Sequence, residues 1–327
     1  MQNLSPPHGP IMEGFGDRFE SPEDYILTCT ADIWEGRGIA ALDWHYADDL
    51  LVRTPAGIHR GNDAGKANTM ATLTEFPDRQ LLGEDVIWCE APDGGFLSSH
   101  RILSTATHRG GAFGPATGRP VRFRTIADTF CKQNRVWDEW LIRDNAAIAL
   151  QLGSTARNVA QALIDAGDHS PPLTPETDLP GPYTGQGNAN SWGDRHCDLL
   201  RRLMAHDFAA IPGAYDRACH LSSPGGAESH GWPAIEEFWI GLRSALPDAT
   251  FDIAHQIGRT DAACPPRSAI RWSLTGTHSG WGRFGAPTGA QIHVMGVSHV
   301  EFGPRGIRRD ITLFDDIAVW TQILLQT

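Results

Sequence analysis

Side chains able to transfer protons recur in pairs that lie about 170 residues apart. His108 and His278 each follow a Thr before a Gly-rich turn, and Asp128 has His299 at the matching place. Imidazole is the side chain best suited to proton transfer near pH 7, and a lone acid within an apolar strand needs a reason to be there. All four are candidate acid–base residues. The alternatives are hydrogen-bonded strand histidines and a solvent-facing Asp128.

Two arginines and several aromatic residues could bind and orient a substrate. Arg101 and Arg271 occupy matching places and could hold an anionic carbonyl or carboxylate group, although a salt bridge with Glu139 or Asp310 explains them equally well. Aromatic side chains can pack a planar substrate, but their usual role is core packing. The aromatic candidates for substrate contact are Trp88, Trp140, Trp272, Trp44 and Tyr46.

These matched positions belong to a long internal repeat. Residues 107–118 recur at 277–289 with one residue inserted, and the match extends upstream to Gly61 and Gly231. Solenoid repeats are only about 20 to 50 residues long, so this period indicates a duplicated globular domain. We predict an N-terminal arm at 1–20, a first domain at 21–153, a linker at 154–190 and a second domain at 191–327.

Each copy shows helical signals first and alternating strand signals afterwards. Ser21 followed by Pro22 and two acids is typical of a helix start, and residues 62–76 read as a helix that Pro77 ends. Further helices are expected at 39–46, 154–164, 197–206 and 232–246, and strands at 50–54, 81–89, 95–106, 121–131, 136–142 and between 251 and 311. This order predicts α+β domains in which a curved antiparallel sheet wraps over N-terminal helices.

Composition and motifs disfavour several classes of protein. The chain has 39 acidic against 27 basic residues, a net charge of -12, which disfavours nucleic acids and anionic membranes as partners. No window approaches the roughly 18 apolar residues of a membrane span, and the N-terminus lacks signal-peptide features.

The cysteine and histidine patterns predict neither disulfides nor a metal site. The six cysteines occupy no matching places in the two copies, which favours free thiols in a reducing, cytoplasmic location. There is no His-x-His or His-Glu-x-x-His motif, so no metal is predicted, and we expect no cofactor. The absence of a Gly-x-Ser-x-Gly elbow argues against an α/β-hydrolase.

The repeated pattern resembles the SnoaL-like polyketide cyclases. The residues that carry the resemblance are Thr107-His108-Arg109-Gly110, the run Phe113-Gly114-Pro115-Ala116-Thr117-Gly118-Arg119-Pro120-Val121, Glu139-Trp140, Asp144 and Leu150-Gln151-Leu152-Gly153, with second-copy matches at 277–280, 284–289 and Asp315. The resemblance implies a cone-shaped α+β barrel in each copy, the fold of ketosteroid isomerase and scytalone dehydratase. Because family members commonly pair as homodimers, it also implies that the two cones pack as an intrachain pseudo-dimer.

The resemblance also implies a catalytic aspartate in each copy. The family's Asp precedes the Leu-Gln-Leu-Gly-like segment, which is the position of Asp144 and, in the second copy, of Asp315. Burial in a cone would raise the pKa of such a carboxyl group and make it a general acid or base near neutrality. Partnered by Asp128 and His299, the copies would hold a carboxylate pair and a His–Asp pair. A helix N-cap is the alternative role for both aspartates.

Two functions fit the sequence. The first is a cofactor-independent enzyme that acts next to a carbonyl of a small apolar molecule, by cyclisation, isomerisation or dehydration. The second is a non-catalytic ligand-binding or scaffold protein in which one or both cones are inactive. A third, separate reading is a single large enzyme with one site between the domains. An open cavity with convergent polar groups would favour the enzyme, and filled cones would favour the scaffold. Further homo-oligomerisation is compatible with either function.

Overall fold

The computed structural model describes residues 10–92 and 94–327, so the first nine residues of the expected arm lie outside the described residues. The chain divides into two compact units. The first holds Met1–Arg53 (described from Pro10), Ile58–Leu141 and Asp178–Gly187, and the second holds Thr54–Gly57, Ile142–Thr177 and Asn188–Thr327. The end of the first repeat and most of the linker segment thus belong to the second unit.

The first sheet has six strands in the order β2-β1-β6-β5-β4-β3. Its strands are β1 (Tyr46–Thr54), β2 (Gly57–Arg60), β3 (Gln80–Glu90), β4 (Phe96–Thr107), β5 (Pro120–Lys132) and β6 (Arg135–Arg143). Strands β3, β4 and β5 pair antiparallel as predicted. Strand β1 instead runs parallel to β6, with Val52 opposite Glu139, so the sheet is mixed and stays open.

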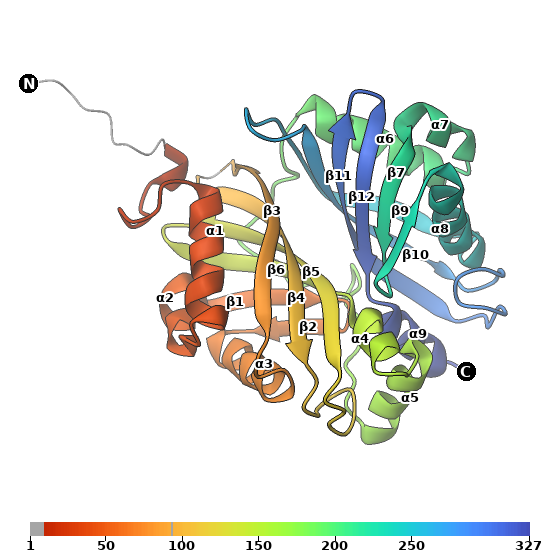
Figure 1. Cartoon of the computed structure of the whole chain (residues 1–327), viewed down its shortest axis with the longest axis horizontal. Helices are drawn as coiled ribbons and strands as arrows, with labels where there is room; N and C mark the ends of the chain where they lie inside the picture. Colours follow the sequence, from red (N-terminus) through yellow and green to blue (C-terminus); the bar gives the residue numbers. More distant parts are fainter. Residues whose placement is uncertain (1–9, 93) are drawn as a thin grey trace, which may run out of the picture. The chain divides into compact units, whose positions relative to one another are not determined.

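Helices from the N-terminal part of the unit lie against this sheet (Figure 1). They are α1 (Pro22–Thr30), α2 (Leu42–His45) and α3 (Asn62–Glu75). Helix α1 begins as predicted, because the Ser21 side chain accepts a hydrogen bond from the Asp24 backbone N–H and Pro22 takes the first position. The core between helices and sheet includes Tyr25, Phe96 and Cys131.

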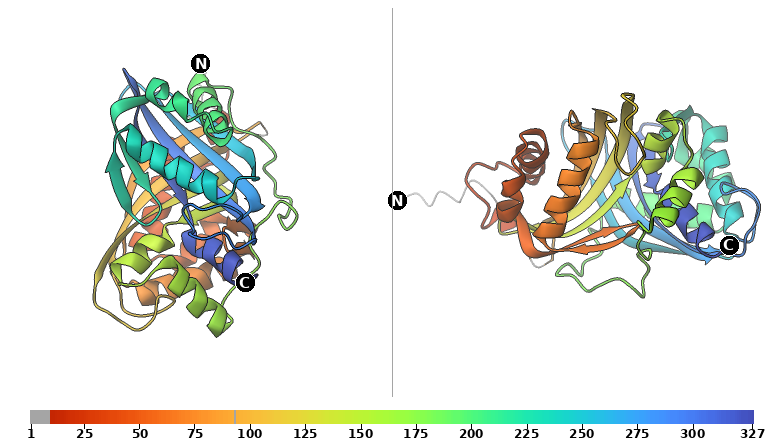
Figure 2. Two further views of the ribbon diagram at one scale, coloured as in Figure 1. Left: turned by 90° about the vertical axis from the view of Figure 1, so that its right-hand side faces the viewer. Right: turned by 90° about the horizontal axis from the view of Figure 1, so that it is seen from below.

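The second sheet repeats the plan in the order β8-β7-β12-β11-β10-β9. Its strands are β7 (Tyr215–Ser223), β8 (Ala227–His230), β9 (Thr250–Arg259), β10 (Arg267–Thr277), β11 (Gln291–Gly303) and β12 (Gly306–Phe314). Again β7 runs parallel to β12. Helices α6 (Ser191–Met204) and α8 (Trp232–Ala245) cover one face (Figure 2), while α7 (Ile211–Ala214) leads into β7. The identical strand order confirms the duplicated α+β fold.

Three further helices pack together within the second unit. They are α4 (Asn145–Gln151), α5 (Ala156–Ala166) and α9 (Asp316–Leu324). Helix α4 ends the first repeat and α9 ends the second, so the two equivalent helices lie in one unit. Helix α5 confirms the expected amphipathic helix after the first repeat, and its cap Thr155 accepts a hydrogen bond from the Asn158 backbone N–H.

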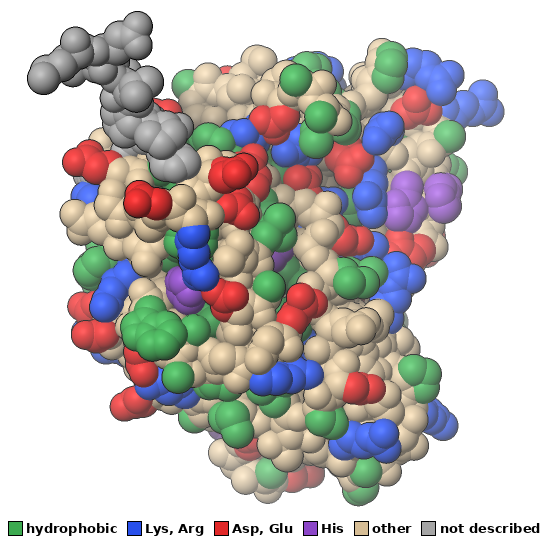
Figure 3. All heavy atoms as spheres, turned by 60° about the vertical axis from the view of Figure 1, so that its left-hand side comes forward, with side chains coloured by type: hydrophobic (Ala, Val, Ile, Leu, Met, Phe, Trp, Pro, Cys, Tyr) green, Lys and Arg blue, Asp and Glu red, His purple; other side chains and the backbone are tan. Residues whose placement is uncertain are grey.

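The surface carries charges of both signs. On the face drawn in Figure 3, Asp and Glu side chains are interspersed with Lys and Arg side chains. All six cysteines are free thiols, and five of them are buried. In the described part of the chain, every helix is too short or too polar to span a membrane.

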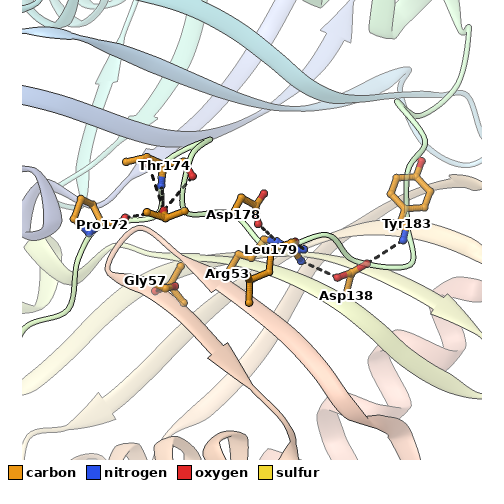
Figure 4. A network of polar contacts seen from close by, with 10 residues as sticks. Arg53, Gly57, Asp138, Pro172, Thr174, Asp178, Leu179 and Tyr183 are labelled. Atoms are coloured by element: carbon orange, nitrogen blue, oxygen red, sulfur yellow. Dashed lines mark hydrogen bonds and ion pairs between the residues drawn. The ribbon is translucent and has the colours of Figure 1, made fainter.

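A buried ion pair attaches the segment Asp178–Gly187 to the first unit (Figure 4). The Arg53 guanidinium group donates to Asp138 Oδ1 at 2.7 Å, to Asp178 Oδ1 at 2.5 Å and to the Leu179 carbonyl oxygen at 2.5 Å. Asp138 Oδ2 accepts from the Tyr183 backbone N–H at 3.0 Å. One arginine thus joins β1, β6 and a segment that has no regular secondary structure of its own.

Replacing Arg53 by Met should destabilise the protein by about 3–5 kcal/mol, because the buried Asp138 carboxylate loses its cation. Urea unfolding of both proteins measures this difference. The matched control is Arg135→Met, which breaks the solvent-exposed pair with Asp48 and should cost less than about 1 kcal/mol. Equal costs for the two variants would contradict a structural role for the Arg53 network.

Candidate functional site

Asp315 combines burial with access to a cavity. It is the N-cap residue of α9 and borders a cavity of about 460 Å³. Its Oδ1 accepts a hydrogen bond from the Ile317 backbone N–H at 2.9 Å, and its Oδ2 accepts one from Asn145 Nδ2 at 2.7 Å. Burial raises the pKa of this carboxyl group to about 7, although both hydrogen bonds oppose the shift. Asp315 is therefore able to exchange a proton near neutral pH.

The cavity lies within the second unit. One wall is α9, another is the end of β10 with the start of β11, and residues of the linker segment 168–176 line it as well. The polar side chains that border it include Asp315, Asn145, Thr275 and His293, and its apolar wall includes Leu163, Pro172, Ile292, Ile317 and Ala318. A largely apolar hollow with a few polar groups is typical of a small-molecule site.

His293 is a further titratable group at this cavity. Its Nδ1 lies 2.7 Å from Thr275 Oγ1. The Gln322 side chain bonds the His293 backbone twice, accepting from the N–H at 2.8 Å and donating to the carbonyl oxygen at 2.9 Å. Burial lowers the pKa of the imidazole, so the ring is neutral at pH 7. Sequence reasoning missed His293 because its counterpart in the first copy is Arg122.

Asp144 has the contacts of a structural cap. It is the N-cap residue of α4, and its Oδ1 accepts from the backbone N–H groups of Ala147 at 3.0 Å and Gly225 at 2.8 Å. Its Oδ2 accepts from the Gly226 N–H at 2.8 Å. Both glycines have positive φ, 90° and 66°, which favours glycine at this turn. Burial raises the pKa of Asp144 to about 6.

The two aspartates therefore differ in setting. Both belong to the second unit, whereas the sequence suggested one in each cone. Asp144 has three backbone N–H partners, and it is not among the described residues that border the cavity with Asp315. Both residues have the contacts of a helix N-cap. Of the two, Asp315 alone also borders the cavity.

Asp128 and His299 lie on the sheet faces turned away from the two helix-covered cores. Asp128 accepts a hydrogen bond from the Ser99 hydroxyl group. Neighbouring strand residues point to opposite faces, and Cys131 and Val300 belong to the cores, so Asp128 and His299 point the other way. Both side chains are buried. His299 does not border the Asp315 cavity, and Asp128 belongs to a different unit from Asp144.

His108 and His278 directly follow the last residues of β4 and β10, beside the Gly-rich turns. His108 Nδ1 lies 3.0 Å from Thr117 Oγ1 and its Nε2 lies 3.2 Å from Glu75 Oε1. His278 Nδ1 lies 3.0 Å from Thr288 Oγ1, and burial lowers the pKa of the ring. These contacts fit the alternative role offered from the sequence, that of a hydrogen-bonded histidine beside a tight turn.

Most of the predicted substrate-binding side chains are buried or half-buried in the fold. Arg101 is buried and pairs with Glu84 at 3.2 Å rather than with Glu139. Arg271 is half-buried on β10. The aromatic candidates are mostly packed in the fold: Trp140, Trp272 and Tyr46 are buried, Trp88 is half-buried against the first core, and Trp44 is 67% exposed.

Sequence reasoning did not select two buried acids as site residues. Glu139 and Asp310 occupy equivalent places on β6 and β12, opposite Val52 and Leu221 respectively. Burial raises the pKa of Glu139 to about 7 and that of Asp310 to about 6. The signal available in the sequence was their matched places in the repeat, together with a tyrosine in each copy at the start of the paired strand, Tyr46 in β1 and Tyr215 in β7.

The fold and the sequence together assign the family. Two open, mixed sheets with the same strand order, each covered on one face by helices, define a duplicated α+β protein of the cone-shaped class. The SnoaL-like polyketide cyclase model matches residues 25–152, and a SnoaL-like domain model matches residues 197–307. The chain is therefore a tandem of two SnoaL-like domains.

Solved structures with one such domain resemble parts of the chain. IdmH of Streptomyces antibioticus, a putative polyketide cyclase, is 23% identical with a TM-score of 0.37, over 41% of this chain and 99% of IdmH. AclR of Streptomyces galilaeus, a putative hydroxylase, is 20% identical with a TM-score of 0.36, over 40% and 94%. A putative polyketide cyclase from Acidithiobacillus ferrooxidans is 19% identical with a TM-score of 0.35, over 43% and 94%. Comparison with curated proteins gave no match.

The Asp315→Asn variant should change how protein stability depends on pH. The folded pKa of about 7 lies above the ordinary value of 3.8, so the stability that Asp315 contributes is complete below about pH 4 and is lost as the pH rises through 7. The loss amounts to about 4 kcal/mol. Asn also caps helices but has no proton to release.

Urea unfolding of both proteins between pH 4 and pH 8 measures this effect. The variant should gain stability relative to the wild type as the pH rises, with most of the change between pH 4 and pH 7. A stability difference that stays constant over this range would show that the Asp315 carboxyl group titrates normally.

Proposed function

We propose that the protein catalyses cofactor-independent proton transfer next to a carbonyl group of a small, largely apolar molecule, with Asp315 as the general base and acid. The observation that carries this proposal is a buried carboxyl group with a pKa of about 7 at the edge of a mainly apolar cavity of about 460 Å³. Ligand sites commonly measure about 300–1,000 Å³. The match of residues 25–152 to the SnoaL-like polyketide cyclase model supports a cyclase-type reaction.

An intramolecular aldol cyclisation illustrates the chemistry. The Asp315 carboxylate removes a proton from the carbon next to one carbonyl group, and the resulting enolate attacks a second carbonyl carbon of the same molecule. A carbon–carbon bond forms, and the new alkoxide takes the proton back from the Asp315 carboxylic acid. Substrate and product are isomers, so the step needs no oxidant, reductant or second substrate. A pKa near 7 suits both halves of this exchange.

His293 and Asn145 support the proposed role. When the Thr275 hydroxyl group donates to Nδ1 of His293, the proton of the neutral ring lies on Nε2. That N–H group can donate to a carbonyl oxygen as negative charge develops on it. Asn145 fixes the orientation of the Asp315 carboxyl group through its hydrogen bond to Oδ2. The remaining lone pairs of Asp315 can accept the proton.

A non-catalytic ligand-binding or scaffold role is the second candidate function. The helix-covered face of the second sheet is filled by the side chains of Trp239, Trp272 and Phe314, which are at most 1% exposed, with ring centroids 6.0–6.4 Å apart. This filled interior favours a packing role for the second cone. The proposed site lies instead at the end of the sheet, beside α9.

Asp315→Asn should reduce catalysis by about 100-fold or more, because a positioned acid–base group contributes about 10²–10⁴. Deuterium incorporation at the α-carbon of 1-tetralone in D₂O, followed by NMR at pH 7, gives a readout before the natural substrate is known. Asp144→Asn is the matched comparison, since it alters an equivalent helix cap away from the cavity. It should change the exchange rate less than threefold.

The opposite result for these two variants would assign the general base to another residue. Full activity of Asp315→Asn with loss of activity in Asp144→Asn would move the base to the first-copy aspartate. A wild-type rate equal to that of solvent alone, together with saturable binding of the ketone, would favour the non-catalytic function.

A further inference from the structure

We propose that Gln322 is a positioning residue of the candidate site: its side chain holds the start of β11 against α9 and thereby fixes where His293 lies relative to Asp315. This role rests on the function proposed for the cavity that all three residues border. Three observations carry it: an edge of β11 that lacks a neighbouring strand, side-chain amides that take the place of that strand, and a different arrangement in the first repeat.

The start of β11 has a strand on one side only. Strand β11 pairs with β10 from Gln291 onward, but its pairing with β12 covers only the part that begins at Gly296, opposite Phe314. After Phe314 the chain leaves β12 and turns into α9 (Figure 1). The backbone groups of residues 291–295 that point away from β10 therefore need other partners.

Two glutamines, Gln322 in α9 and Gln326 just after it, supply such partners. Gln322 Oε1 accepts a hydrogen bond from the His293 backbone N–H at 2.8 Å, and its Nε2 donates to the His293 carbonyl oxygen at 2.9 Å. Gln326 bonds the backbone of Gln291 in the same way, at 2.9 Å in both directions. Each side-chain amide thus takes the place of a peptide group of a neighbouring strand.

The spacing of the two glutamines matches the strand. Four residues of an α-helix advance about 6 Å along its axis, and two residues of a strand advance about 6.7 Å. Glutamines four positions apart can therefore bond alternate strand residues, whose N–H and C=O groups point to the same side. A glutamine suits this task because its amide carries an acceptor and a donor. Gln322 is the buried member of the pair, whereas Gln326 is exposed.

Gln322 connects the helix of the acid to the strand of the histidine. Asp315, Ala318 and Gln322 all border the cavity, and their helical spacing places them on one face of α9. The Gln322 Nε2 group also donates to the Ala318 carbonyl oxygen at 3.2 Å, which orients the amide on that face. The contact of His293 Nδ1 with Thr275 Oγ1 requires the strand to stay in this place. The helix capped by Asp315 therefore also fixes the backbone of His293.

The first repeat differs at the matching places. Gln151 corresponds to Gln322, but Pro120 takes the place of Gln291 and has no backbone N–H to donate. An arginine takes the place of the cavity histidine. The arrangement of two glutamines is therefore a feature of the second repeat, which is the one with a histidine at the cavity.

Nitrogen-15 NMR of the full chain tests the placement of His293. The ¹⁵N shifts of the two ring nitrogens report which of them carries the proton, and so report the contact between Nδ1 and Thr275. Gln322→Met removes both hydrogen bonds to the His293 backbone, so the two shifts should move toward one another as part of the molecules lose that contact. Gln322→Glu, which keeps an acceptor for the N–H group, should shift less, and it serves if the Met variant does not fold.

Deuterium exchange into 1-tetralone measures the effect on catalysis. Gln322→Met should lower kcat about tenfold and leave KM within about twofold, because a slightly misplaced catalytic group can cost on the order of 100-fold. The matched control is Gln256→Met, which removes the hydrogen bonds of a half-buried glutamine to Asn188 and Asp194 in the same unit. Gln256 is not among the described residues that border the cavity. This variant should keep the wild-type kcat and the wild-type shifts of His293.

The two measurements separate a failure of this role from a failure of the proposed function. A wild-type exchange rate equal to that of solvent would contradict the function, and the ¹⁵N shifts would still decide whether Gln322 places His293. Unchanged shifts in Gln322→Met would overturn the role, and so would changed shifts with an unchanged kcat in an active enzyme. Equal changes in Gln256→Met would also overturn it, because any loss of hydrogen bonds in the unit would then have the same effect.

Discussion

The candidate site depends on two opposing effects on the ionisation of the Asp315 carboxyl group. Its position as the α9 cap places backbone and side-chain N–H groups on both carboxyl oxygens, and these favour the ionised form. Burial favours the neutral form, and the charge of Asp316 next to it acts in the same direction. Arg283 pairs with Asp316 at 2.6 Å, which limits that repulsion. The balance leaves a cap residue that is half-ionised near neutral pH, and the orientation of α9 fixes where its carboxyl group points.

Much of the fold could be predicted because its signals are local. Ser21 and Pro22 start α1, and the alternating residues of β4 and β5 form the expected strands. The parallel pairing of β1 with β6 could not be predicted, because it joins residues such as Val52 and Glu139 that are far apart in the sequence. The same limit applies to α4, since its grouping with the second unit depends on contacts with α5 and α9.

The site was predictable only in part. The repeat with the family resemblance selected Asp315, and the sequence allowed either a helix cap or an acid–base group there. The structure gives it the cap contacts and also a cavity. The partners of Asp144 were not predictable, because Gly225 and Gly226 lie 81 and 82 residues away. His108 was selected because imidazole can transfer protons near neutral pH. In the structure its ring nitrogens lie within hydrogen-bond distance of Thr117 and Glu75, beside the turn.

Duplication gives each buried acid a counterpart, and the contacts of the two members differ in both pairs. Asp144 accepts three backbone N–H groups, whereas Asp315 accepts one backbone and one side-chain N–H and borders a cavity. Asp310 is held by the hydroxyl groups of Tyr215 and Thr312, whereas Leu141, which cannot donate a hydrogen bond, takes the place of Thr312 in the first repeat. Because the strand order around both members of each pair is the same, the neighbouring side chains and loops, and not the fold, set these differences.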